Sequence, residues 1–164
     1  MIAILMGVTA SGKTTIALEL KKLTGWEYAE GDDYHSEANR AKMHAGIPLT
    51  DEDRAPWLAS LHEVLEGWHK AGKSGVLTCS ALKQAYRDAL VGGLLPDVWR
   101  FVLLQVPVEE LKRRLEHRAG HYMNPNLLQS QIQTLEEPRD AIRVDATGEP
   151  QEIAERVLQQ LQGV

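Results

Sequence analysis

A glycine-bounded loop lies close to the start of this sequence. Residues 2–6 are apolar and predict a strand. The residues that follow fit the pattern G-x-x-x-x-G-K-[ST] and read Gly7-Val8-Thr9-Ala10-Ser11-Gly12-Lys13-Thr14. Glycines let backbone N–H groups turn inward at the start of a helix, where they and a lysine amine bind phosphate oxygens. The sequence therefore predicts a strand, a phosphate-binding loop and a helix, in that order.

A loop of this kind holds a nucleoside triphosphate. Lys13 would reach the outer phosphates, and the hydroxyl of Thr14 can ligate Mg²⁺. The cofactor-binding residues that we predict run through the loop and include Thr15. Because kinases, GTPases, ATPases and nucleotide-gated switches share this motif, it leaves the activity open.

Length and composition favour one globular domain. The chain has 164 residues, of which 43% are hydrophobic and 25% charged. A net charge of -5 argues against a nucleic-acid partner. We expect neither a membrane span nor a targeting leader, because no apolar run approaches ~18 residues and the apolar start has no basic leader. With Cys79 as the only cysteine, no intrachain disulfide can form, and we expect a cytoplasmic protein.

Short apolar runs alternate with helical patterns along the whole chain. This alternation predicts an α/β fold with a central five-stranded parallel sheet and helices on both faces. The expected strands are residues 2–6, 26–30, 76–79, 99–104 and 142–144. Besides the helix that follows the loop, the expected helices are residues 36–45, 54–71, 108–118 and 149–161. Thr50 or Asp53 can cap the second of these, and Gly72 can end it.

An acidic turn follows the second expected strand, whose carboxyl end should lie beside the phosphate loop. Asp32 or Asp33 can accept the proton of an attacking hydroxyl, and Asp32 can order Mg²⁺ through water. Both could instead be ordinary turn or cap residues. His35 contacts a ligand or is a plain polar loop residue.

These residues and several later blocks resemble the gluconate kinases of the P-loop small-molecule kinase superfamily. The resemblance covers nearly the whole chain. It is densest in residues 42–58 and 79–88, blocks that shikimate and adenylylsulfate kinases do not share. The matching blocks are Gly31-Asp32-Asp33-x-His35, Asn39-x-x-Lys42-Met43-x-x-Gly46-x-Pro48-Leu49-x-Asp51-x-Asp53-Arg54-x-Pro56-Trp57-Leu58, Cys79-Ser80-Ala81-Leu82-Lys83-x-x-Tyr86-Arg87-Asp88, Arg118-x-Gly120-His121-Tyr122-Met123, Leu128-x-Ser130-Gln131, Thr134-Leu135-Glu136-x-Pro138 and Val144-Asp145.

The resemblance implies a three-layer P-loop kinase fold with a helical lid, in a single domain spanning residues 1–164. It also implies ATP-dependent phosphorylation of D-gluconate on its 6-hydroxyl, with Mg²⁺ and as a homodimer. The chain departs from the family at Thr9-Ala10-Ser11, where many relatives have Ser-Gly-Ser, and in a short segment after Pro138. The first change removes no phosphate-binding group, and the second bears on contacts with adenine.

Gluconate carries a carboxylate and a row of hydroxyls, so its pocket should hold a bidentate arginine and neutral polar groups. Arg54 and Arg87 are the candidates for the carboxylate, although an arginine beside acids is often a surface ion pair. The other substrate-binding residues that we predict are Asp33, His35, Lys42, Ser80, Lys83 and His121. Cys79 has no activating partner in the sequence, and we expect it to be buried at a strand end.

A basic segment at about residues 112–128 resembles the lid of small-molecule kinases. Arg114 and Arg118 would bind the nucleotide there, and Arg118 would also stabilise the charge on the transferring phosphoryl group. The alternative is a solvated basic helix face. Two other functions stay open at this point: a kinase for another metabolite, such as shikimate or adenylylsulfate, and a switch that binds ATP without catalysis.

Overall fold

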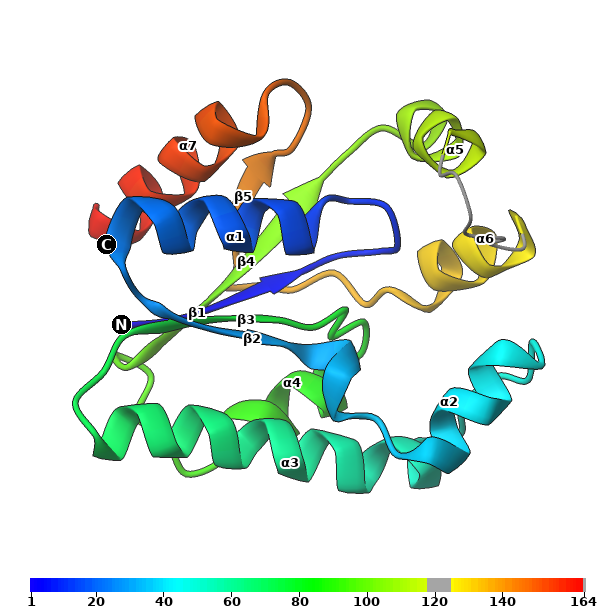
Figure 1. Cartoon of the computed structure of the whole chain (residues 1–164), viewed down its shortest axis with the longest axis horizontal. Helices are drawn as coiled ribbons and strands as arrows, with labels where there is room; N and C mark the ends of the chain where they lie inside the picture. The colour runs from blue at the N-terminus through cyan, green and yellow to red at the C-terminus, as the bar shows by residue number, and fades with distance from the viewer. Residues whose placement is uncertain (118–124, 164) are drawn as a thin grey trace.

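The computed structural model describes residues 1–117 and 125–163 of the chain, and it has a layer of strands between two layers of helices (Figure 1). In chain order the elements are β1 (Ile2–Met6), α1 (Lys13–Thr24), β2 (Glu27–Glu30), the 3₁₀ turn η1 (Gly31–Tyr34), α2 (Glu37–His44), α3 (Asp51–Lys70), β3 (Gly75–Thr78), α4 (Gln84–Val91), β4 (Trp99–Gln105), α5 (Val108–Glu116), α6 (Pro125–Thr134), β5 (Ile142–Asp145) and α7 (Pro150–Gln162).

The strands form one parallel sheet in the order β2-β3-β1-β4-β5. This confirms the predicted five-stranded parallel sheet. After β1 the chain forms β2 and β3 on one side of it, and then crosses to form β4 and β5 on the other side. Such a change of direction opens a crevice at the carboxyl ends of the central strands, where open α/β sheets bind their ligands.

The central strand β1 is buried on both faces because its side chains alternate between two cores. Ile2, Ile4 and Met6 pack with helices α3 and α4 on one face. Ala3 and Leu5 pack with α1 and α7 on the other. A parallel strand covered by helices on both sides has to be apolar at every position, as β1 is.

The helices differ from the sequence prediction chiefly at α3, α4, α5 and α6. Helix α3 begins at Asp51, three residues earlier than expected, because Thr50 and Asp53 form a capping box: each side chain accepts the backbone N–H of the other. Helix α5 ends at Glu116, before the expected end at residue 118. Helices α4 and α6 were not predicted: α4 has only 8 residues, and α6 is rich in uncharged polar residues.

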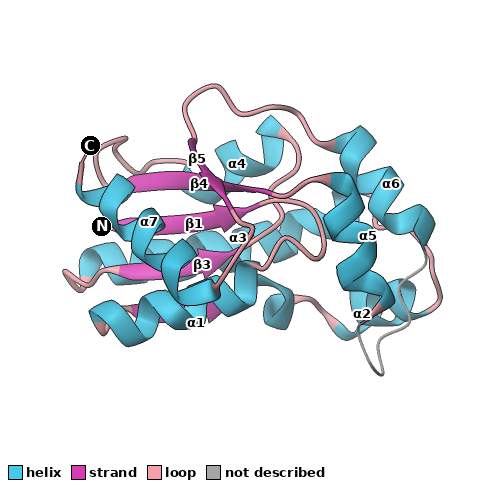
Figure 2. Ribbon diagram, turned by 90° about the horizontal axis from the view of Figure 1, so that it is seen from above, coloured by secondary structure: helices cyan, strands magenta, loops and turns pink. Residues whose placement is uncertain are grey.

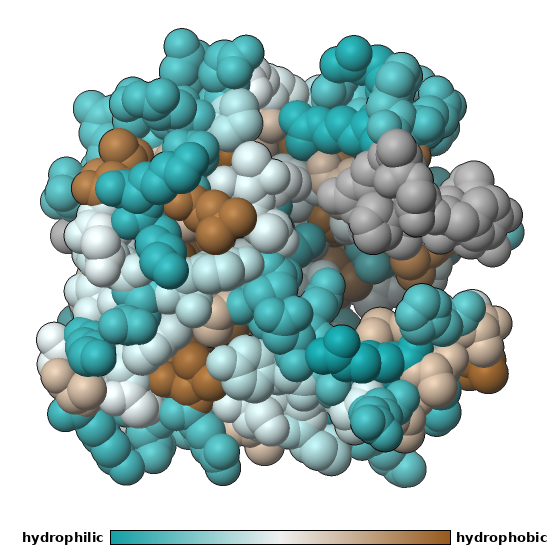
Figure 3. All heavy atoms as spheres, in the orientation of Figure 1, coloured by the Kyte–Doolittle hydropathy of each residue, from teal (hydrophilic) through white to brown (hydrophobic). Residues whose placement is uncertain are grey.

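Helices α2, α5 and α6 lie beyond the carboxyl ends of the strands, at the end of the molecule opposite both termini (Figures 1 and 2). A third, small core joins the phosphate loop to α5 and α6; its buried members are Val8, Ala10, Leu82, Leu111 and Leu128. In the orientation of Figure 3 the surface is mostly hydrophilic, with separate apolar patches. Among the described residues no helix is long and apolar enough to cross a membrane.

Candidate active site at the carboxyl ends of the strands

The phosphate loop is already curled in this structure. Gly7 (φ 143°) and Gly12 (φ 96°) adopt backbone angles that favour glycine, and Gly12 caps helix α1. A Cβ on Gly7 would lie 3.0 Å from the Ser11 hydroxyl and 3.2 Å from the Leu104 carbonyl. Inside the curl, the Lys13 amine donates to the carbonyls of Gly7 (2.9 Å) and Val8 (3.1 Å). The loop therefore has the compact form that the motif predicts.

Two of the predicted ligand-binding residues lie against this loop. Arg114, on α5, donates from Nη1 to the Ala10 carbonyl (3.0 Å) and from Nη2 to the Ala146 carbonyl (2.9 Å). It thereby bridges the phosphate loop and the segment after β5. The Ser80 carbonyl accepts the Gly7 N–H at 3.3 Å, which brings the loop after β3 beside the phosphate loop.

The acidic turn sits at the end of β2 because Gly31 packs against β3. The Gly31 N–H donates to the Thr78 hydroxyl (3.2 Å), and its carbonyl accepts the Trp57 indole N–H (2.7 Å). A Cβ on Gly31 would lie 2.1 Å from the Thr78 carbonyl oxygen, so only glycine fits. This contact leaves Asp32 and Asp33 exposed at the carboxyl end of the sheet, where the phosphate loop also lies.

Glu30 is a functional candidate that no sequence motif singles out. Its Oε2 accepts the hydroxyl of Thr14, the predicted metal ligand, at 2.7 Å, and the hydroxyl of Tyr28 at 2.6 Å. Burial, together with this bond to Glu30, raises the pKa of Tyr28. The carboxylate hydrogen-bonded to Thr14 is thus Glu30 and not Asp32. Its position at the last residue of β2, just before the acidic turn, was the available signal.

His35 is held in place by its neighbours. Its ring stacks on Trp57 with centroids 4.1 Å apart, and Nδ1 lies 3.4 Å from the Asn39 side-chain nitrogen. Burial lowers its pKa, so the imidazole is neutral at physiological pH. Arg40 donates to the carbonyls of Asp33 and His35, which fixes the backbone of the acidic turn.

Lys42, predicted to bind substrate, pairs with Asp53 in this structure. The amine lies 2.9 and 3.0 Å from the two carboxylate oxygens. The Thr50 N–H and Lys42 together lower the pKa of Asp53 to about 2. The pair ties helix α2 to the start of α3, next to the acidic turn.

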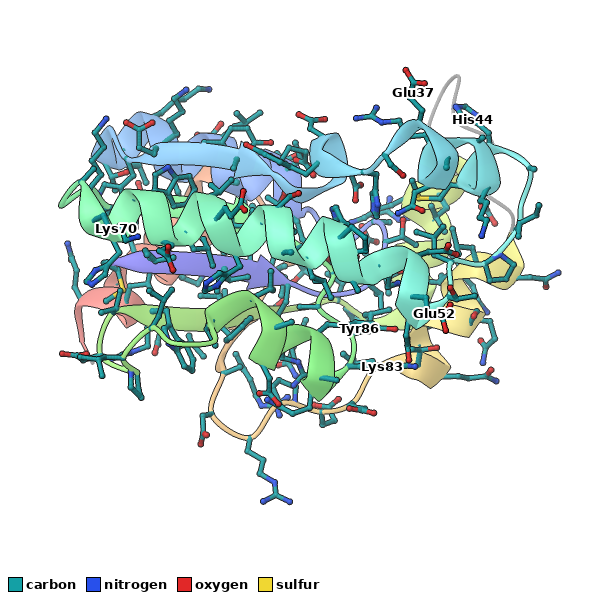
Figure 4. All side chains as sticks on the ribbon, turned by 90° about the horizontal axis from the view of Figure 1, so that it is seen from below. Glu37, His44, Glu52, Lys70, Lys83 and Tyr86 are labelled. Carbon is teal, nitrogen blue, oxygen red and sulfur yellow. The ribbon has the colours of Figure 1, made fainter. Side chains whose placement is uncertain are left out.

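Arg54 and Lys83 lie together in a cluster with Tyr86 and Asp51. Arg54 Nη1 donates to the Tyr86 hydroxyl (3.2 Å), which donates to Asp51 (2.6 Å), and the Lys83 amine is 3.5 Å from Asp51. Both cations also lie over the Tyr86 ring. Lys83 and Tyr86 are close to each other near the start of α3, whereas Lys70 marks its far end (Figure 4). Tyr86 is a further member of the site that sequence reasoning did not select.

Arg87, predicted to bind the substrate carboxylate, is engaged inside the protein in this structure. The side chain is only 2% exposed. Its guanidinium donates to the Gln84 side chain and to the backbone carbonyls of Ala81, Leu82 and Glu136. Four of its five N–H donors are thus used inside the protein. Arg87 fastens the loop after β3 to the segment that follows α6.

This arrangement predicts that Arg87→Lys destabilises the protein without removing a substrate contact. A lysine cannot reproduce the forked donors and leaves buried carbonyls unpaired, which costs about 2 kcal/mol. Thermal denaturation should show a Tm lower by about 4–8 °C. The control is R139K, since Arg139 is exposed and follows α6. An unchanged Tm combined with a greatly raised KM for substrate would restore the original role.

Burial raises the pKa of Cys79 to about 12, as expected for a packed thiol rather than a nucleophile. Arg118 and His121 lie outside the described residues. Within residues 1–117 and 125–163, no three or more His, Cys, Asp or Glu side chains are grouped so as to hold a metal ion.

The parallel sheet and the phosphate loop together give the chain the fold of the P-loop kinases. A family model described as an AAA domain matches residues 3–133. Shikimate kinase from Aquifex aeolicus superposes with a TM-score of 0.61 at 19% identity, covering 99% of this chain and 97% of that one. At such identity the likeness concerns the fold alone.

The closer relatives are more specific. A gluconokinase from Gluconobacter oxydans is 46% identical over 162 residues, covering 97% of this chain and 90% of the relative. The thermosensitive gluconokinase of Escherichia coli is 40% identical over 95% of this chain and 84% of its own. The crystal structure of a gluconokinase from Sinorhizobium meliloti has a TM-score of 0.87 at 39% identity, covering 98% and 91% of the two chains. The chain belongs to the gluconokinase family.

Proposed function

We propose that this protein transfers the terminal phosphoryl group of ATP to the 6-hydroxyl of D-gluconate, giving 6-phospho-D-gluconate and ADP. The observation that carries the proposal is the 46% identity to a gluconokinase over 97% of the chain, in a protein whose phosphate loop is fully assembled. Shikimate and adenylylsulfate kinases match in fold at 16–19% identity, so no comparable observation favours their substrates.

The nucleotide would be held by the phosphate loop. Its backbone N–H groups and the Lys13 amine, which lies inside the curl against the Gly7 and Val8 carbonyls, would bind phosphate oxygens. Arg114 adds positive charge beside Gly12, since a Cβ on that glycine would lie 3.8 Å from its Nη1. These groups stabilise the negative charge that the phosphoryl group carries during transfer.

Mg²⁺ is a suitable partner for this site because the side chains offered are oxygen donors. Thr14 and Glu30, whose side-chain oxygens are 2.7 Å apart, would hold it, with Asp32 acting through water as predicted. When bound, the ion neutralises phosphate charge. A carboxylate hydrogen-bonded to the hydroxyl at this loop position is a geometric basis for such a site.

The acceptor would bind on the α2–α3 side of the loop. Arg54 and Lys83 supply positive charge for the gluconate carboxylate, and His35 supplies a neutral imidazole for hydroxyls. Asp32 or Asp33 accepts the proton of the gluconate 6-hydroxyl. The hydroxyl oxygen then bonds to the terminal phosphorus of ATP, and the bond from that phosphorus to the ADP oxygen breaks. Because the chain resembles the gluconate kinases, we also propose that it is a cytoplasmic homodimer. Sedimentation of the purified chain would test the dimer.

An acceptor panel tests the function. Purified protein with ATP and Mg²⁺ should form ADP with D-gluconate and not with shikimate, adenylylsulfate or buffer alone. Phosphorus–proton coupling in the NMR spectrum of the product should place the phosphate on carbon 6. Turnover with another acid but not gluconate would overturn the substrate, and ATP binding with no acceptor phosphorylated would favour the ATP-binding switch.

A further inference from the structure

One contact links the phosphate loop to a helix far away in the sequence. The backbone N–H of Thr9 donates to Oε1 of Gln131, on α6, at 2.6 Å and across 122 residues. This hydrogen bond connects a side chain of α6 directly to the backbone of the phosphate loop. No role for Gln131 follows from the nucleotide-binding chemistry described above.

The Thr9 N–H belongs to the same peptide unit as the Val8 carbonyl. A trans peptide is planar, with its N–H and C=O pointing in opposite directions, and the structure has no cis peptide bonds among its described residues. The Val8 carbonyl accepts the Lys13 amine at 3.1 Å. Gln131 therefore accepts a hydrogen bond from one side of this peptide unit, and Lys13 donates one to its other side. Rotation of the peptide unit would break both hydrogen bonds.

Helix α6 is well placed to hold this peptide steady. Leu128, on the same helix, is buried in the small core that contains Val8 and Ala10. Just beyond the helix, the Glu136 N–H donates to the Leu82 carbonyl (2.8 Å), and the Glu136 side chain accepts the Gln84 N–H (2.8 Å). Arg87 fastens the same place through the Glu136 carbonyl. The glutamine thus projects from an anchored helix and not from a loose surface segment.

We propose that Gln131 is a positioning residue: by fixing the Val8–Thr9 peptide from helix α6, it sets the place of the Lys13 amine for nucleotide binding. The inference rests on the proposed function only in taking ATP as the ligand of the loop. The end of α6 also connects the two sides of the site. The loop after β3, on the acceptor side, is bonded to Glu136 just beyond this helix, and the peptide that contacts Lys13, on the nucleotide side, is bonded to Gln131.

A double-mutant cycle on nucleotide affinity tests the proposal. The four proteins are the wild type, Q131M, K13M and the double variant, titrated with AMPPNP and Mg²⁺ by calorimetry. Methionine keeps the length of glutamine but cannot accept the Thr9 N–H. Loss of this one hydrogen bond should weaken AMPPNP binding by about tenfold in the Lys13 background and by less than about twofold in the K13M background, because the effect passes through Lys13.

The control is Q133M, since Gln133 is an exposed neighbour on the same helix. It should bind AMPPNP as the wild type does, and thermal denaturation should show all variants folded. Equal losses from Q131M in both backgrounds would overturn the proposal, since Gln131 would then act independently of Lys13. So would wild-type affinity in Q131M. These titrations contain no acceptor, so a wild type that binds AMPPNP but leaves gluconate unphosphorylated would refute the function and still decide the role of Gln131.

Discussion

Replacing Lys13 by alanine should lower turnover with ATP and gluconate by about 10²–10³-fold, the loss typical of removing one preorganised electrostatic contact to a transition state. The amine lies inside the phosphate loop, against the carbonyls of Gly7 and Val8. It is only partly buried and is not a member of the hydrophobic cores, so the fold should survive. Steady-state kinetics with a coupled ADP assay and a thermal melt would measure both effects.

The matched control is Lys21→Ala, an exposed lysine at the far end of the same helix. It should leave kcat and KM unchanged. Near-normal turnover by K13A would contradict the assignment of the loop, and a collapse of Tm in K13A would mean that the lost activity reflects unfolding.

Gly31→Ala should have the largest effect on stability. The new methyl group would lie 2.1 Å from the Thr78 carbonyl oxygen, which is part of the sheet and cannot move aside without disturbing β3. We expect the free energy of unfolding to fall by about 3 kcal/mol or more, at the upper end for overpacking, and Tm to fall by about 6–12 °C. Activity should fall too, because Asp32 and Asp33 directly follow this residue.

Gly67→Ala is the opposite case and serves as the control. Gly67 lies inside helix α3, and a methyl group added to it would meet no atom within 4 Å outside its own stretch of helix. Alanine there should stabilise the protein by about 0.5–1 kcal/mol, because glycine costs a helix conformational entropy. Urea denaturation would measure the change in the free energy of unfolding for both variants. If that change had the same sign in both, steric contact at Gly31 would not explain the need for glycine.

The sheet and the phosphate loop were predictable because their signals are local. Apolar runs marked β1, β3 and β4 to within one residue, weaker patterns marked β2 and β5, and the glycines and Lys13 follow one another in a fixed pattern. The helices α4 and α6 escaped prediction because α4 has only 8 residues, too few to show a clear helical period, and α6 is rich in uncharged polar residues. The start of α3 was also predicted wrongly, because the reciprocal bonds of Thr50 and Asp53 decide the boundary.

The individual site residues were harder to predict, because their roles depend on contacts between distant segments. Arg87 looked like a ligand for an anion, yet its partners are carbonyls as far away as Glu136. Glu30 was overlooked beside two more conspicuous aspartates, although only the folded structure brings Thr14 to it. Residue type and spacing showed that positive and acidic groups gather near the loop, but not which of them are already engaged by the protein.

The small core of Val8, Ala10, Leu82, Leu111 and Leu128 has a consequence for how the molecule opens. Its five buried members belong to neither of the two larger cores that hold the sheet, which it meets, within the described residues, only through the partly buried Val106 and Leu135. Local unfolding follows such divisions, because a unit with little buried apolar surface opens at a lower free energy than the whole domain. We therefore expect this end of the molecule to open less rarely than the sheet, although α6 is anchored in the folded state, so that amide hydrogens in α5 and α6 exchange with solvent ahead of those in β1.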